Sequence, residues 1–144
     1  MKPFLKLFGL IAASCWMGAC SGGLYASNGS GNPVVLKDGD AGKWVRIRLT
    51  DPLSIELLSN PTTGFLWKIA AIDDTMIRLD DQETYIPDRV PPGIVGSGGK
   101  TVFPFRLLRP GRTEIVFEYR RPFEKKPEPE KRIVFQLEIG DVEQ

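Results

Sequence analysis

The sequence predicts an all-β fold, an immunoglobulin-like antiparallel β-sandwich of about seven or eight strands. Three observations predict it. Apolar residues recur at every second position in several short segments, which is the period of a half-buried strand. The 12 prolines and 15 glycines lie between these segments rather than in one tract, so they mark turns. No segment carries a sustained helical repeat, although residues 70–79 have room for one turn.

The strands are expected from residue 33 onward. In 44–49 the apolar residues Val45, Ile47 and Leu49 alternate with arginines, so this segment presents one face to the core and one to water. Further strands are expected at 53–57, 65–69, 77–79, 84–86, 101–107, 113–119 and 132–139. The last two alternate most clearly, and in 132–139 the residues Ile133, Phe135, Leu137 and Ile139 point to one face.

Segment 101–107 contains a proline. Phe103, Phe105 and Leu107 lie on one face of this strand and Pro104 lies on the other. Because proline has no N–H to donate to a neighbouring strand, we expect an edge strand or a bulge here.

The first nineteen residues predict an export signal. Lys2 and Lys6 precede an apolar run at 7–17, which is too short to span a bilayer and has the length of a secretory signal. The sequence Met17-Gly18-Ala19-Cys20 then resembles the lipobox of bacterial lipoproteins, with Met where Leu is usual. The resemblance implies a signal peptide at 1–19 and diacylation of Cys20. The alternative is a plain signal peptide cut nearby, after Ala26 for example.

This resemblance also implies a location. The mature protein would be exported and lipid-anchored in the cell envelope through its acylated N-terminal cysteine. By similarity to Gram-negative lipoproteins, Ser21 in place of Asp favours the outer membrane, with the domain facing the periplasm or the surface.

The mature chain would have 144 − 19 = 125 residues and a formal charge of 17 − 18 = −1, since Lys2 and Lys6 are removed. Cys15 leaves with the signal, so no cysteine pair remains for a disulfide. Residues 20–32 are rich in Gly, Ser and Asn, which predicts a flexible tether. Residues 33–144 form the domain, which we expect to be a monomer.

Composition excludes several function classes. The chain has no histidine, which removes Ser-His and Cys-His nucleophile pairs and imidazole metal sites. We therefore expect no metal and no cofactor. A net charge of +1 over the whole chain supplies no basic face for nucleic acid.

Three segments between strands carry the functional signal. We call residues 60–65 the threonine loop, 91–99 the glycine loop and 120–131 the arginine loop. In the threonine loop, Pro61 fixes φ and Gly64 allows a positive φ, so two threonine hydroxyls are held at the tip. We expect Phe65 to enter the core and fix the exit of the loop. Taken alone, this pattern also fits an ordinary stable turn.

The other two loops offer different surfaces. The glycine loop has bare backbone that an extended partner chain can pair with. A strand is expected after it, whereas a phosphate-binding loop is followed by a helix. The arginine loop joins the two clearest strands. It contains Phe123 beside a proline, either a local packing plug or an anchor for a partner. The charges that follow form a solvated surface.

Together the three loops resemble the chagasin family of inhibitors of papain-like cysteine peptidases. The matching segments are NPTTGF, then GSGG, then RRPF, within a domain from about 34 to 139. Phe123 stands where the family often has Trp. The resemblance implies a reversible inhibitor, not an enzyme, whose three loops occlude the active-site cleft of a papain-like peptidase. The implied peptidase-binding residues are Asn60, Pro61, Thr62, Thr63, Gly64, Phe65, Gly96, Ser97, Gly98, Gly99, Arg121, Pro122 and Phe123.

Two other functions fit parts of the sequence. A surface-anchored adhesion or assembly module would use the same loops as structural turns, although it has no need of all three motifs. An enzyme would need an acid/base pair, for which Asp73-Asp74 or Asp80-Asp81 are the candidates. Adjacent carboxylates on a strand point to opposite faces, however, so we expect these to be solvated turns.

Overall fold

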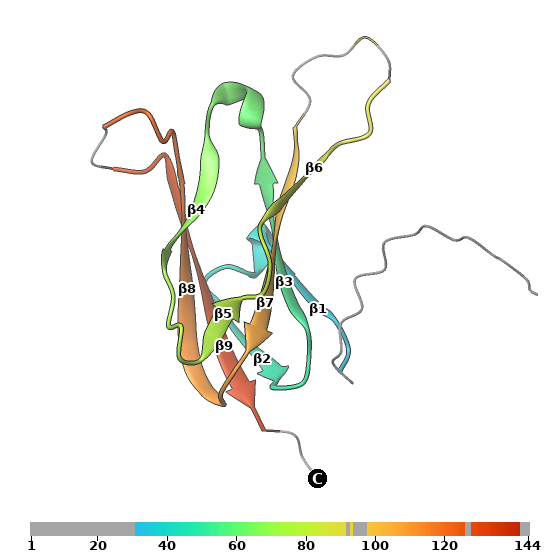
Figure 1. Ribbon diagram of the computed structural model, residues 1–144, viewed down its shortest axis with the longest axis vertical. Helices are drawn as coiled ribbons and strands as arrows, with labels where there is room; N and C mark the ends of the chain where they lie inside the picture. Colours follow the sequence, from blue (N-terminus) through green and yellow to red (C-terminus); the bar gives the residue numbers. More distant parts are fainter. Residues whose placement is uncertain (1–30, 92, 94–97, 126–127, 142–144) are drawn as a thin grey trace, which may run out of the picture.

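A computed structural model describes residues 31–91, 93, 98–125 and 128–141, and these form two β-sheets packed face to face (Figure 1). The predicted all-β sandwich is confirmed. The first sheet contains β1 (Val34–Lys37), β3 (Leu53–Ser59), β5 (Ile77–Leu79), β6 (Thr84–Pro87) and β7 (Gly99–Leu107). The second contains β2 (Trp44–Arg48), β4 (Leu66–Ala71), β8 (Gly111–Arg120) and β9 (Lys131–Gly140).

The first sheet has the order β1-β3-β7-β5, with β6 also pairing with β7, and the second has the order β2-β9-β8-β4. Two pairings are parallel, β1 with β3 and β2 with β9, and the other described pairings are antiparallel. The sequence did not predict β1 as a separate strand. Only Leu36 of this strand is buried, and its apolar residues are consecutive, so no alternation marks it.

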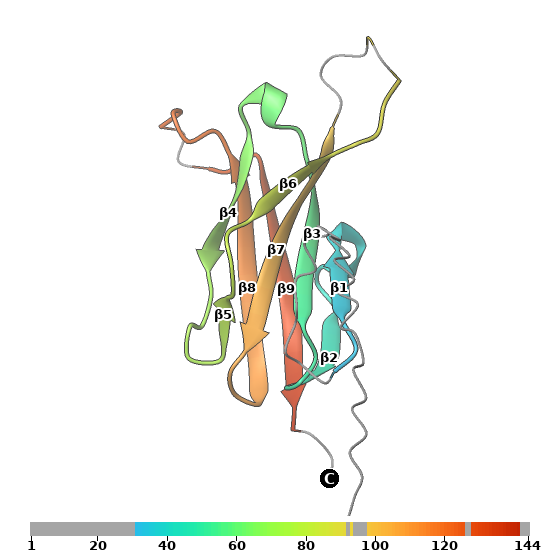
Figure 2. The same cartoon turned by 45° about the vertical axis from the view of Figure 1, so that its right-hand side comes forward.

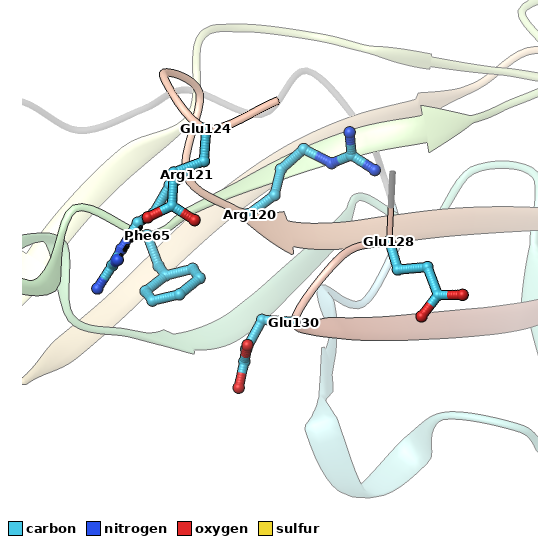
Figure 3. Close-up of a pocket in the computed structure, with 6 residues that line it drawn as sticks. All are labelled: Phe65, Arg120, Arg121, Glu124, Glu128 and Glu130. Atoms are coloured by element: carbon cyan, nitrogen blue, oxygen red, sulfur yellow. Dashed lines mark hydrogen bonds and ion pairs between the residues drawn. The ribbon is translucent and has the colours of Figure 1, made fainter. Parts of the chain in front are cut away.

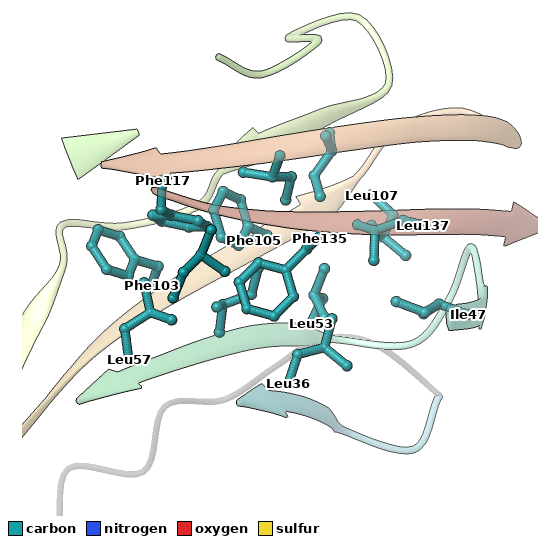
Figure 4. Packing of buried hydrophobic residues seen from close by; sticks show 14 of the residues in the cluster. Leu36, Ile47, Leu53, Leu57, Phe103, Phe105, Leu107, Phe117, Phe135 and Leu137 are labelled. Carbon is teal, nitrogen blue, oxygen red and sulfur yellow. The ribbon is translucent and has the colours of Figure 1, made fainter. Parts of the chain in front are cut away.

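The core lies between the two sheets and is built from the inward residues of the alternating strands (Figure 4). Phe117 is at its centre, with ring centroids 4.9 Å from Phe103, 5.9 Å from Phe135 and 6.3 Å from Phe105. The predicted inward residues of 132–139 are all buried; they are Ile133, Phe135, Leu137 and Ile139. Aromatic pairs at such distances add about 0.5–1.5 kcal/mol each beyond the area they bury. Both cysteines lie outside the described residues. The described part of the chain therefore contains no disulfide, and the apolar packing of this core stabilises it.

The prediction of an edge strand or a bulge at residues 101–107 was wrong, and the register of β7 with β3 continues through Pro104. β7 is a central strand, with β3 on one side and β5 and β6 on the other. Residues 99–102 of β7 pair with β6, and residues 105–107 pair with β5. Pro104 lies in the gap between these two pairings. The carbonyl of Pro104 accepts a hydrogen bond from Asp80 N on this side. The N–H and C=O of one strand residue point the same way, so the missing N–H faces the break between two short strands.

The described parts of all three loops lie at one end of the sandwich (Figures 1 and 2). The threonine loop follows β3 and contains the 3-10 turn η2 (Pro61–Thr63), the glycine loop precedes β7, and the arginine loop joins β8 to β9. The described chain starts at the opposite end, because Val34 pairs with Leu53, the first residue of β3. A second 3-10 turn, η1 (Asp38–Asp40), follows β1.

Among the described residues, no helix is long and apolar enough to cross a membrane.

Candidate functional site

The threonine loop is a single tight turn. Pro61–Thr63 form one turn of 3-10 helix, and Gly64 ends it in the left-handed conformation with φ 80°, as its position predicted. Two backbone hydrogen bonds close the turn, from Thr63 N to Asn60 O at 3.1 Å and from Gly64 N to Pro61 O at 2.9 Å. The hydroxyl of Thr63 donates to Asn60 O at 2.6 Å and that of Thr62 to Asn60 Oδ1 at 2.5 Å. The loop is therefore rigid and protrudes from the sandwich.

Tyr119, near the end of β8, supports the threonine loop from below. Its hydroxyl accepts a hydrogen bond from Asn60 N at 3.1 Å, and its ring stacks on Phe65 with centroids 5.2 Å apart. The Trp67 ring also packs against Tyr119, with ring centroids 4.8 Å apart. Phe65 thus rests on Tyr119 at the top of the core and does not enter the core as expected. No motif in the sequence indicated this role, although the alternation of β8 places Tyr119 on the same face as Phe117.

Arg121 of the arginine loop joins that loop to the threonine loop (Figure 3). Its Nε donates to Thr63 O at 3.1 Å, and its guanidinium lies over the Phe65 ring, 4.3 Å from the centroid. A second nitrogen, Nη1, pairs with Glu124 at 2.6 Å. Arginine can make these contacts together because its guanidinium is planar and carries several donors. Two loops 58 residues apart in sequence are thereby held as one unit.

Phe123 is the most exposed large apolar side chain in the described part of the protein, with 73% of its surface accessible. Its ring covers Gly64, since a Cβ built on Gly64 would lie 3.1 Å from Phe123 Cζ. Gly64 is therefore needed twice, for its positive φ and for this close approach. Of the two sequence-based readings of Phe123, a packing plug or an anchor, the exposure favours the anchor.

The glycine loop is described only in part. Gly96 and Ser97 lie outside the described residues, whereas Gly98 directly precedes β7 and Gly99 is its first residue. Gly99 pairs with Ser59, the residue before the threonine loop. A Cβ on Gly99 would lie 2.4 Å from the carbonyl oxygen of Ile86 on the neighbouring strand, so only glycine fits there. The base of the glycine loop is therefore held beside the base of the threonine loop.

The hollow between the loops does not suit a small substrate. It is lined by Phe65, Arg120, Arg121, Glu124, Glu128 and Glu130 (Figure 3). Its cavity volume is about 20 Å³, which is room for one water molecule. Recognition at this end must therefore use the protruding surface of the loops.

The acidic pairs considered for catalysis lie in turns, as expected. Asp73 accepts hydrogen bonds from Thr75 N at 3.0 Å and Thr75 Oγ1 at 2.6 Å. The hydroxyl bond is the main reason that the pKa of Asp73 lies below its usual value. Asp80 pairs with Arg106 at 2.6 Å. In the portion of the chain that the structure covers, no three Asp, Glu, His or Cys side chains are grouped so that they could hold a metal ion.

The sandwich presents three loops at one end. Two of them are braced together, and one carries an exposed aromatic side chain. This is the architecture of a protein-binding module. Comparison with known proteins identifies the family. The model described as "Chagasin family peptidase inhibitor I42" matches residues 46–139, so the chain belongs to the chagasin family of peptidase inhibitors. The resemblance found in the sequence is confirmed, and membership places the chain with inhibitors and not with enzymes.

Named relatives agree in sequence and in fold. Amoebiasin-2 of Entamoeba histolytica is 30% identical over 105 residues, which cover 73% of this chain and 84% of that protein. The crystal structure of the cysteine protease inhibitor EhICP2 from the same organism has a TM-score of 0.67 at 28% identity, covering 75% of this chain and 96% of that one. Leishmania mexicana ICP has a TM-score of 0.52 at 29% identity, covering 70% and 90% respectively.

Proposed function

We propose that this protein is a reversible inhibitor of papain-like cysteine peptidases, and that its three loops occlude the active-site cleft of the enzyme. The observation that carries the proposal is the bracing of the threonine loop by Arg121, beside the exposed Phe123. A structural relative is described as a cysteine protease inhibitor, which supports the class of target.

In this proposal the threonine loop enters the cleft beside the catalytic cysteine and histidine of the peptidase. The glycine loop and the arginine loop contact the two sides of the cleft. The internal hydrogen bonds of the threonine loop support this role, because a loop that is already ordered loses little conformational entropy on binding. Three loops together bury on the order of 800 Å² on each partner, the size of a stable interface. The proposed contact residues are the thirteen named from the sequence.

The inhibitor would not be consumed as a substrate. Attack on a peptide bond requires its carbonyl carbon about 3–3.5 Å from the nucleophile in an aligned geometry. The backbone of Pro61–Thr63 is instead a closed 3-10 turn that ends in a left-handed glycine. Binding would be reversible and independent of metals, because it uses neither a covalent bond nor an ion.

Titration of papain with purified residues 28–144, which contain all the described strands, tests the proposal. We expect competitive inhibition that dilution reverses. Phe123→Ala should raise the inhibition constant about 30-fold, equivalent to about 2 kcal/mol, because truncation removes a central exposed aromatic. If neither papain nor a second papain-like peptidase is inhibited at micromolar concentration, the inhibitor proposal is wrong and the adhesion or assembly module takes its place.

We also propose that the protein is an exported lipoprotein, held to the outer membrane by acylated Cys20. The lipobox-like sequence supports this. The position of the first described residues also supports it, because they lie at the end of the sandwich opposite the loops. An anchor before residue 31 would then direct the three loops away from the membrane. In cells, Cys20→Ala should abolish incorporation of a labelled fatty acid and release the protein to the soluble fraction; unchanged membrane association would refute the anchor.

A further inference from the structure

An exposed apolar row lies next to the loops, on the outer face of the first sheet. The outward-facing residues of β3 are Ser54, Glu56 and Leu58. The first two are polar, as expected on a solvent-facing side, whereas the last is apolar. Leu58 is 72% exposed. Only its backbone makes polar contacts, since Leu58 O accepts from Trp67 Nε1 and Leu58 N donates to Asp38. A leucine so exposed on a regular strand has no role in the core.

The register of the sheet extends this apolar surface to β6. Leu58 and Ile86 both pair with Lys100, one from each side. Ile86 is 44% exposed. The ammonium group of Lys100 is drawn away from the row by an ion pair with Glu56 at 2.7 Å. Its aliphatic stem therefore lies between two apolar side chains, and we call Leu58, Lys100 and Ile86 the apolar row.

Two carboxylates beside the apolar row, those of Asp38 and Glu56, already have partners. Asp38 pairs with Lys131 at 2.9 Å and accepts the hydrogen bond from Leu58 N, while Glu56 holds Lys100. Covering the row with another protein would bury apolar surface without leaving either of these carboxylates unpaired, and an unpaired buried charge is the costly case in interfaces. An apolar centre with a satisfied polar rim is the usual anatomy of a protein interface.

The row is continuous with the proposed binding loops. Leu58 lies two residues before Asn60, and Lys100 directly follows Gly99. We propose that the apolar row is an additional binding surface that contacts an apolar part of the bound peptidase beside its cleft, on the side of the glycine loop. This inference rests on the proposed function and adds a selectivity determinant to it: peptidases with an apolar surface at that position are bound more tightly than those with a charged one.

Matched threonine substitutions test this proposal. Leu58→Thr and Ile86→Thr remove apolar surface and keep good strand formers. Val35→Thr is the control, because Val35 lies on the same face, has the same 44% exposure as Ile86, and pairs with Ser54 in the half of the sheet away from the loops. Each variant of residues 28–144 is measured for papain inhibition, for its dissociation rate from papain and for its thermal unfolding midpoint.

We expect Leu58→Thr to raise the inhibition constant about tenfold, mainly through faster dissociation, and Ile86→Thr to raise it by a smaller factor. Val35→Thr should inhibit like the wild type, and all midpoints should agree within a few degrees. Equal inhibition by Leu58→Thr and the wild type, or equal weakening by Val35→Thr, would overturn the additional surface while leaving the proposed function intact. Absence of inhibition by the wild type would overturn both.

Discussion

The two ends of the sandwich each use an arginine to hold the chain, but in different ways. At the end where the described chain begins, Arg48 donates to the Asp51 carboxylate from Nε at 3.2 Å, Nη2 at 3.1 Å and its backbone N at 3.2 Å. The same carboxylate accepts a hydrogen bond from Asn32 N at 3.2 Å. At the loop end, Arg121 donates to a backbone carbonyl, pairs with Glu124 and stacks on Phe65.

The difference is in what each arginine leaves exposed. The Asp51 side chain is only 7% exposed, and its partner Arg48 is three residues away in sequence. Together with the hydrogen bond from Asn32 N, this contact fixes the backbone where the chain enters the domain. Arg121 connects two loops that are distant in sequence, and beside it Phe123 remains uncovered. The first end contributes to stability and the second organises a surface for a partner. Substitutions at the two ends should therefore change different measurements.

The largest effect is expected at the tip of the threonine loop. Thr63→Glu places a charge where binding in the proposed cleft removes water, so we expect the inhibition constant for papain to rise at least about 100-fold, equivalent to about 3 kcal/mol. The free energy of unfolding should fall by only about 1 kcal/mol, because one hydroxyl hydrogen bond is lost from an exposed turn.

Thr63→Gln separates the charge from the size of the new side chain. It should weaken inhibition less than Thr63→Glu does. If Thr63→Glu inhibits as well as the wild type, the threonine loop does not enter the cleft. The loop end of the sandwich would then not be the peptidase-binding end.

At the other end, Asp51→Asn should lower the free energy of unfolding by about 2 kcal/mol at pH 7, because an amide group facing four donors leaves some of them unpaired. Inhibition of papain should not change. The hydrogen bonds from the Arg48 side chain are the main reason that the pKa of Asp51 lies below its ordinary value of 3.8.

This lowered pKa gives the stability difference a pH dependence. The unfolded state binds the proton at higher pH than the folded state, so the contribution of Asp51 is complete above the unfolded pKa and is lost as pH falls through the folded one. Urea unfolding of wild type and variant at several pH values should show their difference shrinking below about pH 4. A difference that stays constant down to pH 2 would contradict the assignment.

The parts of the structure that the sequence predicted are those fixed by local chemistry. Proline at the first position and glycine after the turn determine the threonine loop, and Gly64 has the positive φ that this pattern requires. Strands with strict alternation were also predicted, because one side chain in two must face the core. β1 was missed, since its burial depends on a parallel pairing with β3 that its own residues do not encode.

The remaining differences arise from contacts between distant segments. Pro104 predicted a strand edge, and its missing N–H does lack a strand partner, but the reason is a break between two other strands. The contact of Arg121 with Thr63 was not foreseen because the two residues come together only when β4 pairs with β8. Arg48 and Asp51 also carried no signal in the sequence, since neither interrupts a pattern.

The same conservative substitution at both ends sharpens the comparison. Arg→Lys keeps the charge and removes the planar guanidinium. Arg121→Lys should raise the inhibition constant about five- to tenfold, or about 1 kcal/mol, with little change in unfolding. Arg48→Lys should lower the free energy of unfolding by about 1 kcal/mol and leave inhibition unchanged. If each variant changed the inhibition constant and the free energy of unfolding to the same extent, the two ends would not differ in role.

The smallest effect is expected within the arginine loop itself. Lys125 lies four residues after Arg121 and is exposed, in the charged part of the loop interpreted as solvated. An exposed charge is screened by salt over about 8 Å at physiological ionic strength, so Lys125→Ala should change the inhibition constant less than twofold and the free energy of unfolding less than about 0.5 kcal/mol. Measured beside Arg121→Lys at low and physiological salt, it separates the bound part of the loop from the solvated part. A loss of inhibition as large as that of Arg121→Lys would show that the peptidase contact extends along the whole loop.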